Sequence, residues 1–83
     1  MAGVVLVKKE EAGFAYPAHE KVIKIEMHKL LDGWCVDEQS GTRGGTLTRS
    51  WHQTAMLMVE ANTAFDGSVA AAGLQGFVQV PQR

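Results

Sequence analysis

The feature that most constrains the fold is the dipeptide Asp32-Gly33, which stands between two segments of extended character. Residues 21–31 alternate between apolar and charged side chains, a pattern that is typical of a half-buried strand. Asp-Gly is a favoured centre of a two-residue type I′ turn. We therefore expect a β-hairpin, with residues 34–38 as the return strand.

This turn also predicts how the two strands pair. A turn centred on Asp32-Gly33 places Leu31 opposite Trp34 and His28 opposite Asp37. Trp34 and Val36 then lie on the same side of the sheet as the apolar residues of the first strand. Both halves of the hairpin thus agree about which face is the core, and this agreement supports the prediction.

A helix is expected from Ser50 to about Phe65. Ser50 and Gln53 have the spacing of a capping box, in which the first side chain caps the helix and the second reaches back to it. Asp66-Gly67 would end the helix. The short run after it, residues 68–73, is expected to form at most a helical turn.

The apolar stripe of the expected helix is wider than packing on one sheet requires. The stripe consists of Trp51, Ala55, Met58, Val59 and Phe65, and it is widened on one side by Leu57, Ala61 and Ala64. Met56 is expected to be exposed on the opposite side of the helix. Asn62 lies near its middle, where a buried polar group can fix the register of an interface. Trp51, Met58, Asn62 and Phe65 are therefore the candidate interface residues.

Two more strands are expected, over residues 4–7 and 76–80, and the glycine-rich segment 40–48 is expected to be a flexible loop. The sequence thus predicts a single domain over residues 1–83. Its fold class is α+β: a small antiparallel β-sheet packed on one amphipathic helix, with a C-terminal strand.

A chain of 83 residues has little core with which to offset the entropy of folding. Small domains compensate with disulfides, metals or assembly. A single cysteine, Cys35, forms no intrachain disulfide, and the three histidines are too far apart in sequence for zinc-ligand spacing. No cofactor is indicated. We expect self-association into a homodimer or tetramer, and the alternative is a marginal monomer.

The charge pattern weighs against two classes of partner. The net charge is −1, with no basic stripe, so nucleic acid is not an expected partner. No apolar run has the length of a membrane span. The apolar run at residues 4–7 is too short for a signal peptide, and the lone cysteine suits a reducing compartment, so a cytoplasmic location is expected.

Histidines are the candidate catalytic residues. His28 and Asp37 would face each other across the hairpin, and a carboxylate beside an imidazole can prepare it as a general base. Cys35 is a neighbouring nucleophile of the same hypothesis. His52, beside Arg49 at the expected start of the helix, is a second candidate base. The alternative for the first pair is an exposed cross-strand contact with a small effect on stability.

The residue types suggest two candidate ligand sites, each with an alternative interpretation. Arg43 in the glycine-rich loop and Arg49 before the expected helix could hold an anion, and the alternative is a solvated turn. Trp34 and Trp51 could line an apolar pocket, together with Phe14, Tyr16 and the methionines at 27, 56 and 58, and the alternative is core packing.

No motif in the sequence identifies a catalytic, metal or nucleotide site. The favoured hypothesis is a small, oligomeric, non-enzymatic module that binds a protein or a small molecule. The competing hypothesis is a small hydrolase- or nuclease-like enzyme with a histidine-centred site.

Overall fold

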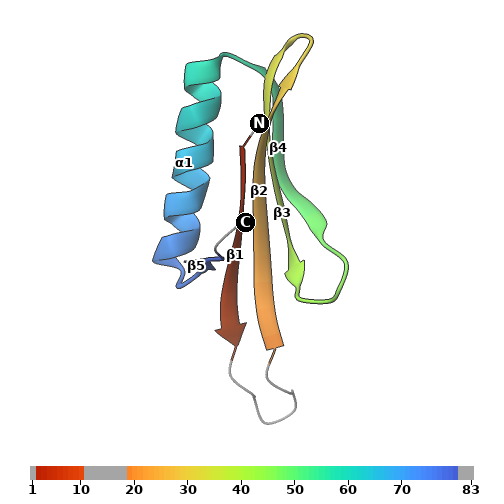
Figure 1. Ribbon diagram of the computed structural model, residues 1–83, viewed down its shortest axis with the longest axis vertical. Helices are drawn as coiled ribbons and strands as arrows, with labels where there is room; N and C mark the ends of the chain where they lie inside the picture. The colour runs from red at the N-terminus through yellow and green to blue at the C-terminus, as the bar shows by residue number, and fades with distance from the viewer. Residues whose placement is uncertain (1, 11–18, 81–83) are drawn as a thin grey trace.

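The computed structural model describes residues 2–10 and 19–80. Over these residues, five strands form one antiparallel sheet and a single helix packs on one of its faces (Figure 1). The elements are β1 (Ala2–Glu10), β2 (His19–Leu30), β3 (Gly33–Thr42), β4 (Thr48–Met56), α1 (Met58–Leu74) and β5 (Val78–Gln79). The spatial order is β4-β3-β2-β1-β5, so β1 to β4 form a meander and β5 adds to its outer edge. The predicted α+β class is confirmed.

The predicted hairpin is also confirmed, but its register differs. Leu30 pairs with Gly33, so the two-residue loop is Leu31-Asp32. Gly33 has a φ of +138°, and a Cβ there would lie 2.9 Å from the carbonyl oxygen of Met56. Glycine is thus needed where the backbone of β4 passes, which explains why it closes the hairpin instead of forming its tip.

The register change leaves the assignment of faces intact. Trp34 lies opposite Lys29, two residues from its expected partner Leu31, and a shift of two positions returns every side chain to the same side of the sheet. Met27 lies opposite Val36, and both are on the face covered by α1, which is the face expected for them. The pairing of His28 changes, because Cys35 and not Asp37 lies opposite it.

The predicted helix boundaries are wrong. Residues from Ser50 to Met56 continue β4, and the side chain of Ser50 donates a hydrogen bond to Glu38 of β3 and caps no helix. The helix begins at Met58, after Leu57, whose backbone N–H donates to the side chain of Glu60 at 2.9 Å. Pairing with β3 therefore overrides the local capping pattern.

The helix also ends later than expected. It passes through Asp66-Gly67, where Gly67 lies on the exposed side, and continues over the alanine-rich residues 70–72. Alanine has the highest helix propensity, which favours this continuation. The chain leaves the helix at Gly76, which has a positive φ of 94° and donates its backbone N–H to Gly73.

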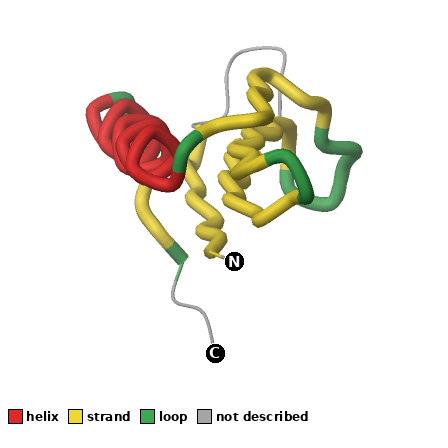
Figure 2. The backbone as a smooth tube through the Cα atoms, turned by 90° about the horizontal axis from the view of Figure 1, so that it is seen from above, coloured by secondary structure: helices red, strands yellow, loops and turns green. Residues whose placement is uncertain are grey.

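The core lies between α1 and the sheet. Its buried apolar residues are Leu6, Ile25, Met27, Val36, Met56, Ala61 and Ala72, with Trp34, Phe65 and Phe77 among those packed against them. Met56, expected to be exposed on a helix, is buried because it is the last residue of β4 and lies opposite Trp34. The other face of the sheet has no helix over it in the described part of the chain (Figure 2).

Candidate functional site

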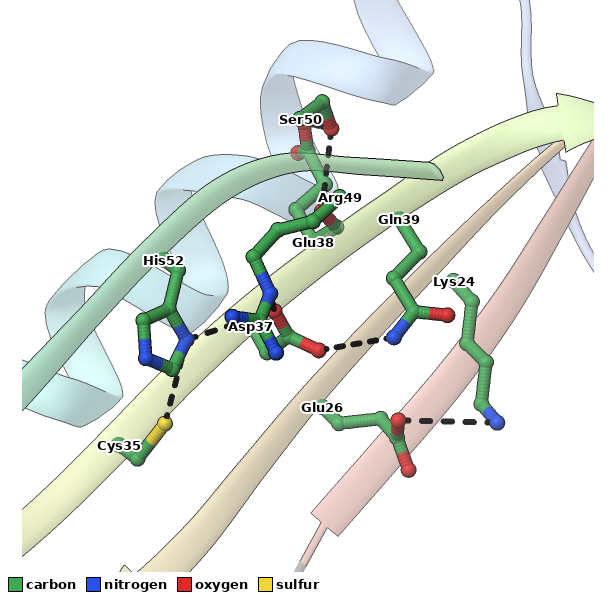
Figure 3. A network of polar contacts seen from close by, with 9 residues as sticks. All are labelled: Lys24, Glu26, Cys35, Asp37, Glu38, Gln39, Arg49, Ser50 and His52. Carbon is green, nitrogen blue, oxygen red and sulfur yellow. Dashed lines mark hydrogen bonds and ion pairs between the residues drawn. The ribbon is translucent and has the colours of Figure 1, made fainter. Parts of the chain in front are cut away.

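We call the sheet face without a helix the open face. Its polar groups gather around Asp37 of β3 (Figure 3). Asp37 lies directly opposite His52 of β4, and only 6% of Asp37 is exposed. His28, the histidine predicted to face Asp37, is one pair further along and lies opposite Cys35. Two of the three candidate catalytic residues, Asp37 and His52, are thus brought together.

Three side chains contact the carboxylate of Asp37. Arg49 Nε lies 2.9 Å from Oδ1, His52 Nδ1 lies 3.5 Å from the same oxygen, and Gln39 Nε2 donates a hydrogen bond of 3.1 Å to Oδ2. The N–H of Arg49 is not aimed along the short contact, so Oδ1 accepts no hydrogen bond among the described residues. Arg49 therefore compensates the buried charge chiefly through electrostatic attraction.

A β-bulge brings these groups to one place. Gln39 pairs with Arg49 whereas Glu38 pairs with Trp51, so Ser50 is the extra residue on β4. The Ser50 hydroxyl contacts both the carbonyl and the carboxylate of Glu38, at 3.1 and 2.9 Å. The bulge places Arg49 and His52 on the same face as Asp37. The sequence analysis missed it because β4 was assigned to a helix.

Cys35 is close to this cluster, but its geometry is not that of an activated nucleophile. Its Sγ lies 3.7 Å from His52 Nδ1, the ring nitrogen that also faces Asp37. A catalytic triad uses the two different nitrogens of the imidazole for its two partners. Burial raises the pKa of the Cys35 thiol, and the negative charge of Asp37 raises it further, so the reactive thiolate is disfavoured.

The described residues contain no group of three or more histidine, cysteine, aspartate or glutamate side chains that could hold a metal ion.

The two arginines of the predicted anion site lie in separate ion pairs. Arg43 Nη1 donates to Glu20 Oε2 at 2.8 Å, and this hydrogen bond raises the pKa of Arg43. Arg49 contacts Asp37. The helix begins at Met58, far along the chain from both, so the expected contribution of a helix N-terminus to an anion site is wrong.

The two tryptophans are on neighbouring strands but do not pair: Trp34 lies opposite Met56, whereas Trp51 lies opposite Glu38. Trp34 is half-buried and packs against the core, whereas Trp51 is 38% exposed on β4. Among the other candidate interface residues, Met58 and Asn62 are exposed and Phe65 is half-buried against the core. The single stripe expected from Trp51 to Phe65 does not exist, because Trp51 belongs to a strand. Phe14 and Tyr16 lie outside the described residues.

A different apolar surface is prominent at the end of the molecule where the β2–β3 turn and the start of α1 lie (Figure 1). We call it the apolar pole; it comprises Leu30, Leu31, Leu57, Met58 and Val59, all of which are exposed. The sequence contains a signal for it. Three consecutive apolar residues at 57–59 exceed what one helix turn can direct toward a single sheet.

A groove lies at the other end of the helix–sheet interface. Its volume is about 620 Å³, and its walls are the last turns of α1 and the adjoining ends of β1, β2 and β3. The helix contributes only small or polar side chains there, Ser68, Ala71, Ala72 and Gln75. The sequence analysis missed this groove because the helix was expected to end before these residues.

No family model, no curated protein and no solved structure gives a significant match to the chain. In the described part of the chain, no helix combines the length and the apolar character needed to cross a membrane.

Proposed function

We propose that the chain is a non-enzymatic, self-associating binding module in which the apolar pole is the contact between copies. The observation that carries this proposal is the exposure of five large apolar side chains at one end of the molecule. Exposed apolar side chains gathered at one end of a domain are typical of interaction sites. Burying them against a second copy contributes about 25 cal/mol for each Å² of apolar surface removed from water, and this contribution is set against the entropy lost on association.

The distribution of apolar residues supports assembly. Among the described residues, eight large apolar side chains are exposed and five are buried in the core. A small domain that buries so little gains much of its stability from a partner.

The charges near the pole favour a second copy as the occupant. Lys29 and Asp32 both flank Leu30 and Leu31, so a two-fold axis through the pole can place Lys29 of one copy beside Asp32 of the other. The net charge of −1 adds little repulsion between copies. A homodimer is the simplest closed assembly of this kind, and a tetramer needs a second contact.

Sedimentation equilibrium over a dilution series tests the proposal. We expect the unmodified chain to be dimeric or larger at micromolar concentration, and the double variant Leu31→Ser with Met58→Ser to be monomeric. Leu74→Ser is the matched control, because Leu74 is as exposed as the pole residues but lies at the opposite end of α1. A monomeric unmodified chain, or equal dissociation in the control, contradicts the proposal.

The second candidate is a small hydrolase- or nuclease-like enzyme centred on His52 and Asp37. The observation in its favour is the buried carboxylate 3.5 Å from the imidazole. Activity toward a chromogenic ester or an oligonucleotide that disappears in His52→Gln and persists in His28→Gln would support this candidate. Activity that is absent, or equal in both variants, leaves the non-enzymatic proposal in place.

We also propose a cytoplasmic location, because Cys35 is free and buried and makes no disulfide that would require an oxidising compartment.

A further inference from the structure

The groove at the end of α1 has the dimensions of a ligand site. A volume of about 620 Å³ lies within the range of pockets that hold small molecules. The helix residues Ser68 and Ala71 have short side chains that leave this space open, while Phe77 and Ile23 contribute apolar lining. At the other end of the same interface, Phe65 and Met56 help to fill the equivalent space.

Two lysines stand side by side at one end of the groove. Lys8 of β1 lies directly opposite Lys21 of β2, on the face that also carries Leu6 and Ile23. The ammonium group of Lys8 lines the groove and can attract an anion at this end. The stem of Lys8 also lies against the end of α1, since its Cε is 3.6 Å from where a Cβ on Gly76 would be.

The opposite end of the groove carries an acid. Glu38 of β3 lines it, and its Oε2 accepts a hydrogen bond of 2.9 Å from Ser50. Glu38 is four residues along β3 from Thr42, the partner of Lys21, which corresponds to a separation of about 13 Å along the strand. Lys8 thus gives one end of the groove a positive charge, Glu38 gives the other a negative charge, and Ile23 and Phe77 add apolar lining.

We propose that this groove binds a short apolar peptide of two or three residues with free termini. The carboxylate of the peptide lies at the ammonium group of Lys8, its own ammonium group lies at Glu38, and its side chains pack on Ile23 and Phe77. An extended chain advances about 3.3 Å for each residue, so a tripeptide spans the distance that remains after the lysine and glutamate side chains reach inward. This inference is independent of the apolar pole, which lies at the other end of α1.

Titration calorimetry with the tripeptide alanyl-leucyl-alanine and the unmodified protein is the direct test. The N-acetylated peptide lacks the ammonium group and the C-amidated peptide lacks the carboxylate. We expect each modification to weaken binding by about tenfold, as for the loss of one charged hydrogen bond. This comparison needs no protein variant, so it does not depend on whether a variant folds. Absence of binding by the unmodified peptide, or equal binding of all three, overturns the proposal.

Three variants assign the two ends of the groove. Lys8→Gln should weaken the free peptide about tenfold but leave the C-amidated peptide unchanged. Lys9→Gln is its matched control, because Lys9 is the next residue of β1 and faces the other side of the sheet. Glu38→Gln should weaken the free peptide and leave the N-acetylated peptide unchanged. Equal effects of Lys8→Gln and Lys9→Gln overturn the assignment of the carboxylate.

Filling the groove gives a further check. Ala71→Leu places a larger side chain in the space while leaving every charge in place, and leucine is a good helix former, so the fold is retained. We expect this variant to lose peptide binding and to keep the oligomeric state of the unmodified chain. Retention of full peptide affinity in Ala71→Leu contradicts the location of the site.

Discussion

Neighbouring residues of β3 are buried on opposite faces of the sheet by different means. Val36 is fully buried beneath α1 among apolar side chains, and Asp37, the next residue, is almost as well covered on the open face by charged and polar groups from β4. Apolar packing depends on the volume that is filled, whereas the polar cover depends on particular partners. Substitutions on the two faces should therefore lower the free energy of unfolding for different reasons.

The largest effect is expected on the helix side. Ile25→Ala should lower the free energy of unfolding by about 2–5 kcal/mol, because it removes a side chain with no exposed surface and leaves a cavity. Urea unfolding followed by circular dichroism measures it. Val5→Ala, at a half-buried residue of the opposite face, should lower the free energy of unfolding by much less. Equal losses at both positions would remove the distinction between the faces.

On the open face, Asp37→Asn should lower the free energy of unfolding by about 1–3 kcal/mol, because Arg49 and His52 lose the charge that they face. The double variant with Arg49→Gln should cost less than the two single variants together, since both remove one interaction. Glu26→Gln is the control, because Glu26 makes only a loose 3.6 Å contact with Lys24. A more stable Asp37→Asn protein would mean that burying the charge outweighs its pairing.

Cys35, on the open face, should make the stability of the fold sensitive to alkaline pH. Burial and Asp37 raise the pKa of its thiol in the folded chain, so the folded state holds this proton more tightly than the unfolded state. Stability should therefore fall as the pH rises from about 8.5, the usual thiol pKa, toward the raised folded value. Cys35→Ala should remove that part of the pH dependence. Rapid alkylation of the folded protein by iodoacetamide at neutral pH would contradict a protected thiol.

The smallest effect is expected at Arg43, whose ion pair with Glu20 stands in solvent. Arg43→Gln should change the free energy of unfolding by less than the error of a urea titration, at any salt concentration, because exposed pairs are screened by water. A clear loss of stability would show that the β3–β4 loop contributes more to the fold than its exposure indicates.

The sequence predicted the elements whose signals are local and agree with their neighbours. Alternation in β2 and the Asp32-Gly33 turn were enough for the hairpin and for its faces. They were not enough for the register, because the position of Gly33 is decided by contact with the backbone at Met56, a residue that is distant in sequence.

The prediction failed at β4 because two signals compete there. Ser50 and Gln53 imitate a helix start, but pairing with β3 draws the segment into the sheet, and the true start at Leu57 lacks a side chain that usually caps helices. The misassignment of β4 also led to a wrong prediction for the candidate site. Asp37 was predicted to face a histidine of the same hairpin, but the histidine opposite it is His52 and not His28, since a bulge in an unrecognised strand sets the contact.

The order of the strands has a consequence for how the chain assembles. Each of the first three strand pairings joins neighbours in sequence, so hairpins can form one after another with short loops to close. The pairing of Val7 with Val78 instead joins nearly opposite ends of the described chain. We expect β5 to dock last during folding and to detach first in native-state fluctuations. The amide of Val80, which donates to Val5, should then exchange its hydrogen faster than the amides between β2 and β3.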